Sequence, residues 1–261
     1  MMGRMKALKL YRVTGFVIRE MDLAEADKII VIFSKKHGKL HAIAKGARKI
    51  QSKLLAGTRL FTISEFILYK GKNLFTVTQC EPKVSFYHLS DDMNRFFYAC
   101  YLAEIIDKVT EIRSPEPMLF DIFFDAIAFL NNVTDVKLTE LVVRYFEIKL
   151  LDLFGYRPEM GCCVSCGKRV VVPKFFNPYK GGVLCDDCSS TGKDLIKLDT
   201  ATVQLMKYLL NCNIKQLGNL KVSDIILEQL EYFTNRFISY VFERDFKSIG
   251  LFRRNKKNKS F

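Results

Sequence analysis

The chain has 261 residues, of which 49% are hydrophobic and 26% charged, and its formal net charge is +13. A chain of this length is expected to form about two domains. Its composition is that of an ordinary globular protein with enough apolar residues for its cores. No run of eighteen apolar residues occurs, which excludes a transmembrane helix.

The positive charge is unevenly distributed along the chain. Residues 1–83 carry 17 Lys/Arg against 6 Asp/Glu, a balance of +11, and residues 84–160 carry 7 against 13, a balance of −6. Residues 161–261 carry 17 against 9, a balance of +8. Basic blocks attract polyanions, above all nucleic acid, so different parts of the chain are expected to have different partners.

Residues 5–81 show the pattern of a small β-barrel. Apolar residues recur in short runs, and glycines fall at the corners, with Gly15 expected to mark a bulge or bend. Such a run of strands without a long helix predicts an OB-fold, although an SH3-like barrel fits the same pattern. The strands are expected at residues 8–20, 28–34, 40–46, 60–69 and 74–79.

Basic residues gather in the turns of this predicted barrel. The connection from Lys45 to Arg59 contains small residues and no acidic residue, so a phosphate backbone can approach it closely. A solvated, solubilising surface would need far less than +11, so we favour nucleic-acid binding. The candidate DNA-binding residues are Lys35, Lys36, Lys39, Lys45, Arg48, Lys49, Lys53, Arg59, Lys70 and Lys72.

An OB-fold grips single strands with a basic groove and aromatic side chains on which bases stack. Most aromatic residues of the barrel alternate with polar ones and are expected in the core; Tyr11, Tyr69 and Phe75 are the better candidates for stacking. No base-reading helix is evident, so recognition is expected to depend on the backbone and on salt.

After residue 90 the apolar residues follow a helical period. Ser90 or Asp91 is expected to cap a helix that stops before Ser114, and Gly155 is the expected end of a third helix. These helices are apolar on more than one face and should pack as a bundle. The other helices are expected at residues 118–131, 139–154, 199–212 and 223–246.

Four cysteines have the spacing of a zinc ribbon, C-x2-C, an 18-residue spacer, and C-x2-C. The predicted ligands are Cys163, Cys166, Cys185 and Cys188, since Cys162 would not give the two-residue spacing. Two disulfides would suit a secreted chain, but no signal peptide opens the sequence, and a redox C-x-x-C would occur once near a βαβ pattern. Four thiolates leave no open position, so we expect one structural Zn²⁺ per chain.

The expected organisation is an α+β multidomain chain. Residues 1–83 form the barrel, residues 84–158 and 193–250 form one helical domain, and residues 159–192 form the zinc ribbon inserted in it. Residues 251–261 form a basic, disordered tail. No motif for nucleotide binding or hydrolysis occurs and the three histidines are scattered, so the sequence predicts a binding protein, not an enzyme.

Taken in order, several short motifs resemble the bacterial recombination mediator family RecO. They are TGFVIRE at 14–20, EADKII at 25–30, HGK at 37–39, AKGAR at 44–48, LFGYRP at 153–158 before Cys163, GGVL at 181–184 before Cys185, and KS at 247–248. Each motif alone is weak evidence for the family, but their order is specific and the resemblance covers nearly the whole chain.

The resemblance implies a cytoplasmic, nucleoid-associated protein that binds single- and double-stranded DNA and anneals complementary strands. It implies work with RecR to help RecA replace the single-strand binding protein SSB, whose acidic tail would dock on the helical domain. Arg95, Arg113, Arg144 and Lys149 are candidates for the basic lining of that docking site, together with residues from the last helices. The chain alone is expected to be a monomer and to make no membrane contact. The alternative is an RNA-binding or transcription accessory protein built from the same parts.

Overall fold

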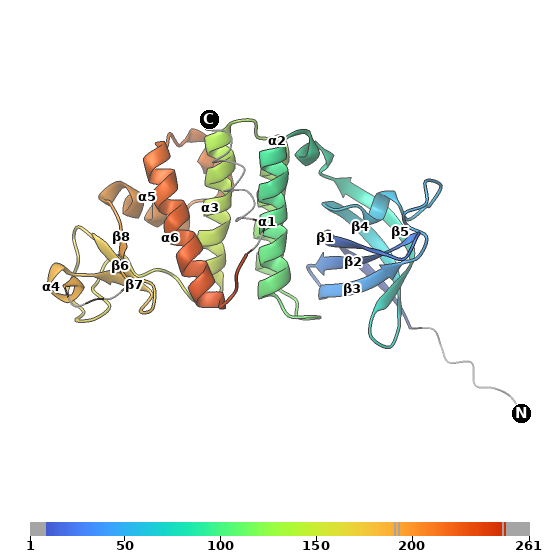
Figure 1. The fold of residues 1–261 in the computed structure, drawn as a ribbon, viewed down its shortest axis with the longest axis horizontal. Helices are drawn as coiled ribbons and strands as arrows, with labels where there is room; N and C mark the ends of the chain where they lie inside the picture. Colours follow the sequence, from blue (N-terminus) through green and yellow to red (C-terminus); the bar gives the residue numbers. More distant parts are fainter. Residues whose placement is uncertain (1–8, 191, 193, 247, 249–261) are drawn as a thin grey trace, which may run out of the picture. The chain divides into compact units, whose positions relative to one another are not determined.

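The computed structural model describes residues 9–190, 192, 194–246 and 248 (Figure 1). The described chain divides into two compact units between Asp121 and Ile122, and each is considered by itself. The basic tail predicted at 251–261 and Lys247 of the last motif lie outside the described residues.

Five strands close into a barrel in the order β1-β2-β3-β5-β4 (Figure 1). Neighbouring strands are antiparallel, except that β3 and β5 pair in parallel through only two positions, Ala42 with Phe75 and Ile43 with Thr76. The strands are β1 (Leu10–Leu23), β2 (Asp27–Ser34), β3 (Gly38–Ala44), β4 (Thr62–Lys70) and β5 (Phe75–Ser85).

The first strand closes the barrel because it pairs with two neighbours. Its first half pairs with β4, its second half pairs with β2, and Phe16 belongs to both pairings, opposite Ile63 and Phe33. The register shifts between Val17 and Arg19, just after the bulge predicted at Gly15. Gly15 serves a different purpose, because a Cβ there would lie 2.7 Å from the carbonyl oxygen of Phe33. The missing side chain permits the close approach of β2.

Side chains alternate between the barrel interior and an outer layer. The interior is filled by twelve buried residues, among them Val13, Ile30, Phe66 and Leu68. On the other face, Phe16 stacks on Phe86 with ring centroids 5.5 Å apart and contacts Phe120 at 5.7 Å. Helix α1 (Met93–Val109) contacts β1, so the first unit includes a helix against the barrel wall.

A buried lysine joins the barrel to α1. Lys39 on β3 is only 7% exposed, and its ammonium donates to the backbone carbonyl of Asp107 and lies 3.2 Å from the carboxylate of the same residue. The chain after α1 then follows β3: Ile112 bridges to Lys39, and the N–H of Arg113 donates to the Lys39 carbonyl at 2.9 Å. This segment is therefore fixed against the β2–β3 hairpin.

The second unit is built around helix α3 (Val136–Leu153), which contacts both α5 (Thr200–Asn211) and α6 (Asp224–Phe242). Helix α2 (Pro117–Asn132) begins in the first unit and continues in the second, where Phe123 meets Phe146 of α3. Because α3 is surrounded, it buries even a charged pair: Arg144 and Glu147 are both fully buried, 3.1 Å apart. The Arg144 guanidinium also donates to the hydroxyl of Thr234 on α6 at 3.0 Å.

The cysteine-containing segment forms a small sheet between α3 and α5. Its strands have the order β7-β6-β8 and are β6 (Phe175–Asn177), β7 (Gly182–Leu184) and β8 (Ile196–Lys197), with the short helix α4 (Asp186–Ser189) after β7. The predicted fold class, an OB-like barrel followed by a helical part with a four-cysteine insertion, is confirmed.

Side chains cap the helix N-termini, and the cap of α1 differs from the predicted one. The first helix is capped by Asp92, whose side chain accepts the Arg95 N–H, because the residues Tyr87–Asp91 form a 3-10 helix that includes Ser90 and Asp91. Asp135, Asp199 and Ser223 cap α3, α5 and α6 in the same way. Gly155 has a positive φ of 82° directly after the last residue of the α3 cap, as predicted for a helix end.

Two glycines with nearly the same backbone provide a test of the fixed hairpin. Gly38 and Gly46 have φ values of 65° and 66°, but only at Gly38 would a Cβ overlap with another segment, the backbone of Ser114. Gly46→Ala should cost about 1 kcal/mol for left-handed backbone alone. Gly38→Ala should cost roughly 2–4 kcal/mol, because overlap adds to the same backbone term. Urea unfolding of the two variants measures the difference; equal losses would contradict the contact.

Candidate nucleic-acid interface and metal centre

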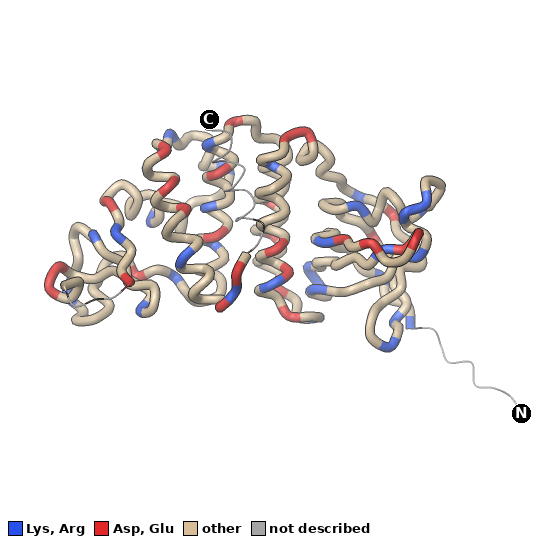
Figure 2. Tube along the Cα trace, in the orientation of Figure 1, with Lys and Arg blue, Asp and Glu red and all other residues tan. Residues whose placement is uncertain are grey.

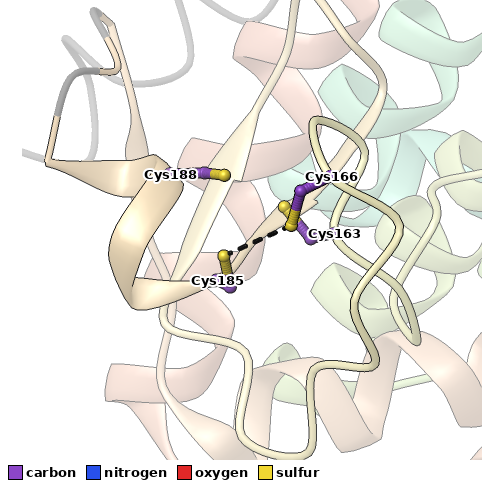
Figure 3. Close-up of side chains that lie close together, drawn as sticks. All are labelled: Cys163, Cys166, Cys185 and Cys188. Carbon is purple, nitrogen blue, oxygen red and sulfur yellow. Dashed lines mark hydrogen bonds between the residues drawn. The ribbon is translucent and has the colours of Figure 1, made fainter.

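The structure brings four cysteines to one place. The sulfur atoms of Cys163, Cys166, Cys185 and Cys188 all lie within 4.8 Å of one another and turn toward a shared space (Figure 3). Cys163 and Cys166 come from the loop after α3, Cys185 lies between β7 and α4, and Cys188 belongs to α4. Cys162 is exposed, is bridged to Arg169 through its backbone, and does not belong to this group.

Backbone hydrogen bonds hold the first pair of cysteines in position. Gly167, with a φ of 74°, donates its N–H to the Cys163 carbonyl at 2.8 Å and so closes the turn, and glycine adopts this left-handed backbone without strain. The N–H of Val164 donates to Val183 at 3.0 Å, which joins this turn to β7 and thereby to the second pair. The two pairs are therefore arranged by the peptide backbone.

The donor set fits zinc. A tetrahedral Zn²⁺ with bonds of about 2.3 Å to sulfur needs sulfur atoms about 3.8 Å apart, and the Cys166 and Cys185 sulfurs are separated by 3.7 Å. Burial opposes ionisation of the Cys163 thiol, yet hydrogen bonds from backbone N–H groups lower its pKa to about 6, toward the thiolate that binds metal. Without a metal, the neighbouring thiols act in the opposite direction on Cys188, because its hydrogen bond with Cys185 raises its pKa to about 12. No histidine or carboxylate belongs to the described cluster, so the site offers four soft ligands.

The small sheet is attached to the helices by aromatic packing. Phe176 of β6 is fully buried, and its ring lies edge-on to Phe233 and Phe237 of α6 at centroid distances of 4.8 and 5.1 Å. Tyr179 of the same segment packs in a similar way on Tyr240 of α6, at 4.7 Å, so aromatic contacts join the metal-binding segment to the helical core.

The other thiols have no such arrangement. Cys80 and Cys100 are half-buried, and burial raises the pKa of both, to about 11 for Cys100. They remain protonated and pack as small apolar side chains.

The ten basic residues predicted to bind DNA fall into two classes. Three are held by other groups of the first unit: Lys39 is buried against Asp107, Lys35 lies 2.7 Å from Asp121, and Arg48 lies 3.2 Å from Asp22. The other seven are exposed, and no described carboxylate lies within ion-pair distance of them. They are Lys36, Lys45, Lys49, Lys53, Arg59, Lys70 and Lys72.

These exposed cations occupy two opposite ends of the barrel. The β2–β3 and β4–β5 turns, with Lys36, Lys70 and Lys72, lie beside the start of β1. The connection 45–59 lies at the end where β1 meets β2, because the N–H of Arg48 donates to the Ala26 carbonyl at 3.0 Å. Figure 2 shows that the Lys and Arg positions of the barrel lie mostly in its turns and loops.

The basic groove expected on the helical part is not formed by the residues proposed for it. Arg144 is fully buried, and the ammonium of Lys149 donates to the Leu210 carbonyl at 2.8 Å. Arg113 belongs to the first unit, where its guanidinium lies 5.2 Å from the centre of the Phe75 ring. Sequence reasoning placed Arg113 wrongly because nothing in the sequence around it signals the return of the chain to β3.

A different hollow with basic and apolar lining exists in the second unit. Its volume is about 440 Å³, and it lies between the start of α3 and the segment before α6. Leu138, Leu141, Leu220 and Val222 supply apolar surface. Lys137 and Lys221 supply positive charge, and Asp135 supplies one negative charge. No helix among the described residues has the length and hydropathy needed to span a membrane.

Comparisons with known proteins identify the family of this chain. The family models described as "Recombination protein O N terminal" and "Recombination protein O C terminal" match residues 5–86 and 90–249. The protein named "DNA repair protein RecO" from Alkaliphilus metalliredigens is 37% identical over 93% of this chain and 98% of its own length. Proteins of the same name from Acetivibrio thermocellus and Pelotomaculum thermopropionicum are 34% and 32% identical, over 91% and 92% of this chain and 94% and 93% of theirs. The chain therefore belongs to the RecO family of DNA repair proteins.

Proposed function

We propose that this chain is a recombination mediator that binds single- and double-stranded DNA, anneals complementary strands without hydrolysing nucleotides, and works with RecR to help RecA replace SSB. The observation that carries the proposal is the set of seven exposed, unpaired cations on a barrel matched by the RecO N-terminal model. The proposed place of this work is the nucleoid, in the cytoplasm. The accessory-protein alternative has no support in the family match.

Binding through such cations is electrostatic and independent of sequence. Each phosphate that a Lys or Arg neutralises releases a condensed counterion, so affinity falls as salt rises. Positive charge on the barrel also screens the repulsion between two strands held on the same protein, which favours annealing. We propose that this activity is centred on residues 1–83, with residues 84–158 and 193–250 as the helical domain. The chain at Arg113, which returns to the barrel after α1, adds to the DNA-binding surface.

The cysteine cluster is proposed to hold one structural Zn²⁺ per chain through Cys163, Cys166, Cys185 and Cys188. When bound, the metal supplies a cross-link between two turns and no reactive position, because all four ligands come from protein. We propose that the ribbon, residues 159–192, stabilises the helical domain through Phe176 and takes no part in DNA chemistry.

The acidic tail of SSB is proposed to dock in the hollow between α3 and the segment before α6. A tail with acidic and apolar residues needs cations beside an apolar surface. Lys221 is exposed and has no ion-pair partner among the described residues, whereas Lys137 lies 3.0 Å from Asp224. Leu138 and Leu220 provide the adjacent apolar contact.

The proposed activity predicts annealing of complementary, SSB-coated oligonucleotides without ATP. The logarithm of affinity for single strands should fall with the logarithm of salt by about 0.7 for each neutralised phosphate. The double variant Lys49→Gln, Lys53→Gln should therefore reduce that slope by about 1.4. Lys35→Gln is the matched control, because its ammonium is already paired with Asp121. Annealing that is absent, or affinity that is indifferent to salt, would exclude the mechanism.

The zinc proposal predicts stability that depends on metal. Zinc at about 100 times its Kd should raise the unfolding free energy by about 2.7 kcal/mol through mass action. Cys188→Ser should lose both the bound zinc and this increase, while Cys162→Ser should keep both. Metal analysis and melting with and without a chelator make the comparison. Zinc retained at one per chain by Cys188→Ser would show the ligand set to be wrong.

Docking of the SSB tail predicts sensitivity to one lysine. Lys221→Glu should weaken binding of the SSB C-terminal peptide by about tenfold, since it reverses a charge beside the bound acid. Lys215→Glu makes the same change at another exposed position of the second unit, outside the hollow. Fluorescence anisotropy of a labelled peptide measures both. If the two variants weakened peptide binding equally, the tail would not dock in this hollow.

A further inference from the structure

One end of the barrel has a hollow of about 230 Å³. Sites for drug-sized ligands measure roughly 300–1,000 Å³, so this one suits a smaller group such as a single ring system. Its walls come from four places in the first unit: the start of β1, the β2–β3 turn, the β4–β5 turn and the chain after α1. The lining residues are Tyr11, Val13, Lys36, His37, Leu40, Lys70, Phe75, Arg113 and Pro115.

Aromatic and apolar side chains form the inner part of the hollow. The rings of Tyr11 and Phe75 meet edge-on, with centroids 5.6 Å apart and an interplanar angle of 80°. Phe75 is buried, whereas Tyr11 is half-buried and keeps part of its ring accessible. The hollow therefore offers a π-surface that solvent reaches.

Positive charge surrounds this apolar surface. Lys36 and Lys70 are exposed, and Arg113 lies over the Phe75 ring, 5.2 Å from its centroid. The lining contains no carboxylate, and none of these three cations has an ion pair with a described residue. The Nδ1 atom of His37 also has no hydrogen-bond partner in the described part of the chain. A ligand that is planar, unsaturated and attached to anionic groups matches both features.

Arg113 is held in place by its surroundings in a strained backbone conformation. Its φ of 62° lies in the left-handed region, which is uncommon for a residue other than glycine. Its N–H donates to the Lys39 carbonyl, Ile112 bridges to β3, and Ser114 lies against Gly38, so the neighbouring strand enforces the conformation. Strained residues of this kind gather at ligand clamps. The backbone of Arg113 is therefore fixed, and its side chain extends from this position to the Phe75 ring.

We propose that this hollow is a binding subsite for one unpaired nucleobase of single-stranded DNA. The base stacks against Tyr11 and the guanidinium of Arg113, and the adjacent phosphates contact Lys36 and Lys70. Bases stack readily on aromatic rings and on guanidinium planes. A paired base inside a duplex must first unstack to enter, so the subsite favours single strands over duplex. This inference rests on the proposed DNA-binding function and adds that the hollow recognises a nucleobase.

The test compares two strands with equal numbers of phosphates, an oligo-dT and a fully abasic oligonucleotide of the same length, at one salt concentration. Stacking of a base on a protein ring strengthens binding by about tenfold or more, so the wild-type chain should bind oligo-dT about tenfold more tightly than the abasic strand. Arg113→Gln and Tyr11→Leu should each reduce that ratio several-fold. Arg59→Gln, which removes one exposed charge at the other end of the barrel, should weaken both strands equally.

A further variant separates binding from folding. Arg113→Gly removes the same charge and relieves the left-handed strain, so its melting temperature should equal or exceed that of the wild type while the ratio still falls. Salt-dependent binding with equal affinity for the two strands would overturn the subsite and leave the proposed function intact. Arg113→Gln behaving like Arg59→Gln would overturn the subsite in the same way. Absence of any DNA binding would overturn the proposed function and the subsite together.

Discussion

A buried ammonium group is the constraint on which the first unit depends. A charge removed from water must be paired, and Lys39 finds its partners in the carboxylate and carbonyl of Asp107, which also pairs with Arg19 of β1 at 3.1 Å. One carboxylate at the end of α1 therefore joins two strands of the barrel. Because the chain leaves α1 at this point, the same contact determines where residues 110–115 run and where Arg113 lies. The hollow at this end of the barrel is therefore positioned by Lys39, a residue that does not line it.

Much of the architecture was predictable because it depends on local patterns. Alternating apolar residues and glycine-containing turns predicted five strands, and the cysteine spacing located the four-cysteine segment. Four of the strands end within three residues of the predicted bounds, whereas β5 continues to Ser85 instead of ending at residue 79. What sequence could not supply was the way strands bend and end. The register shift of β1 lies just after Phe16, the residue that pairs with both β2 and β4. This double pairing results from closure of the barrel, which the sequence pattern does not show. The helix cap moved to Asp92 because a 3-10 turn precedes it.

Sequence-based prediction was also limited at the candidate site, where tertiary contacts decide which charged side chains are exposed. In the sequence, Lys36 and Lys39 are equivalent members of one basic turn, yet one is exposed and the other is buried. The difference follows from strand alternation together with the position of Asp107, which lies 68 residues away. Arg113 was expected in the helical part, residues 84–158, whereas the bridge between Ile112 and Lys39 and the hydrogen bond from its own N–H return it to the barrel. The charge count predicts a class of partner, whereas the tertiary pairing decides which charges remain available.

The ribbon's place in the chain has a consequence for how this architecture can vary. It occupies the connection between α3 and α5, two helices that contact each other directly, so the helix pair is already specified without it. Closure entropy rises by only about 0.6 kcal/mol for each doubling of loop length. A shorter or longer connection would therefore change the helical core little, provided that another apolar side chain replaces Phe176 over Phe233 and Phe237. The geometry therefore predicts that the insertion can be exchanged if the aromatic packing on α6 is kept.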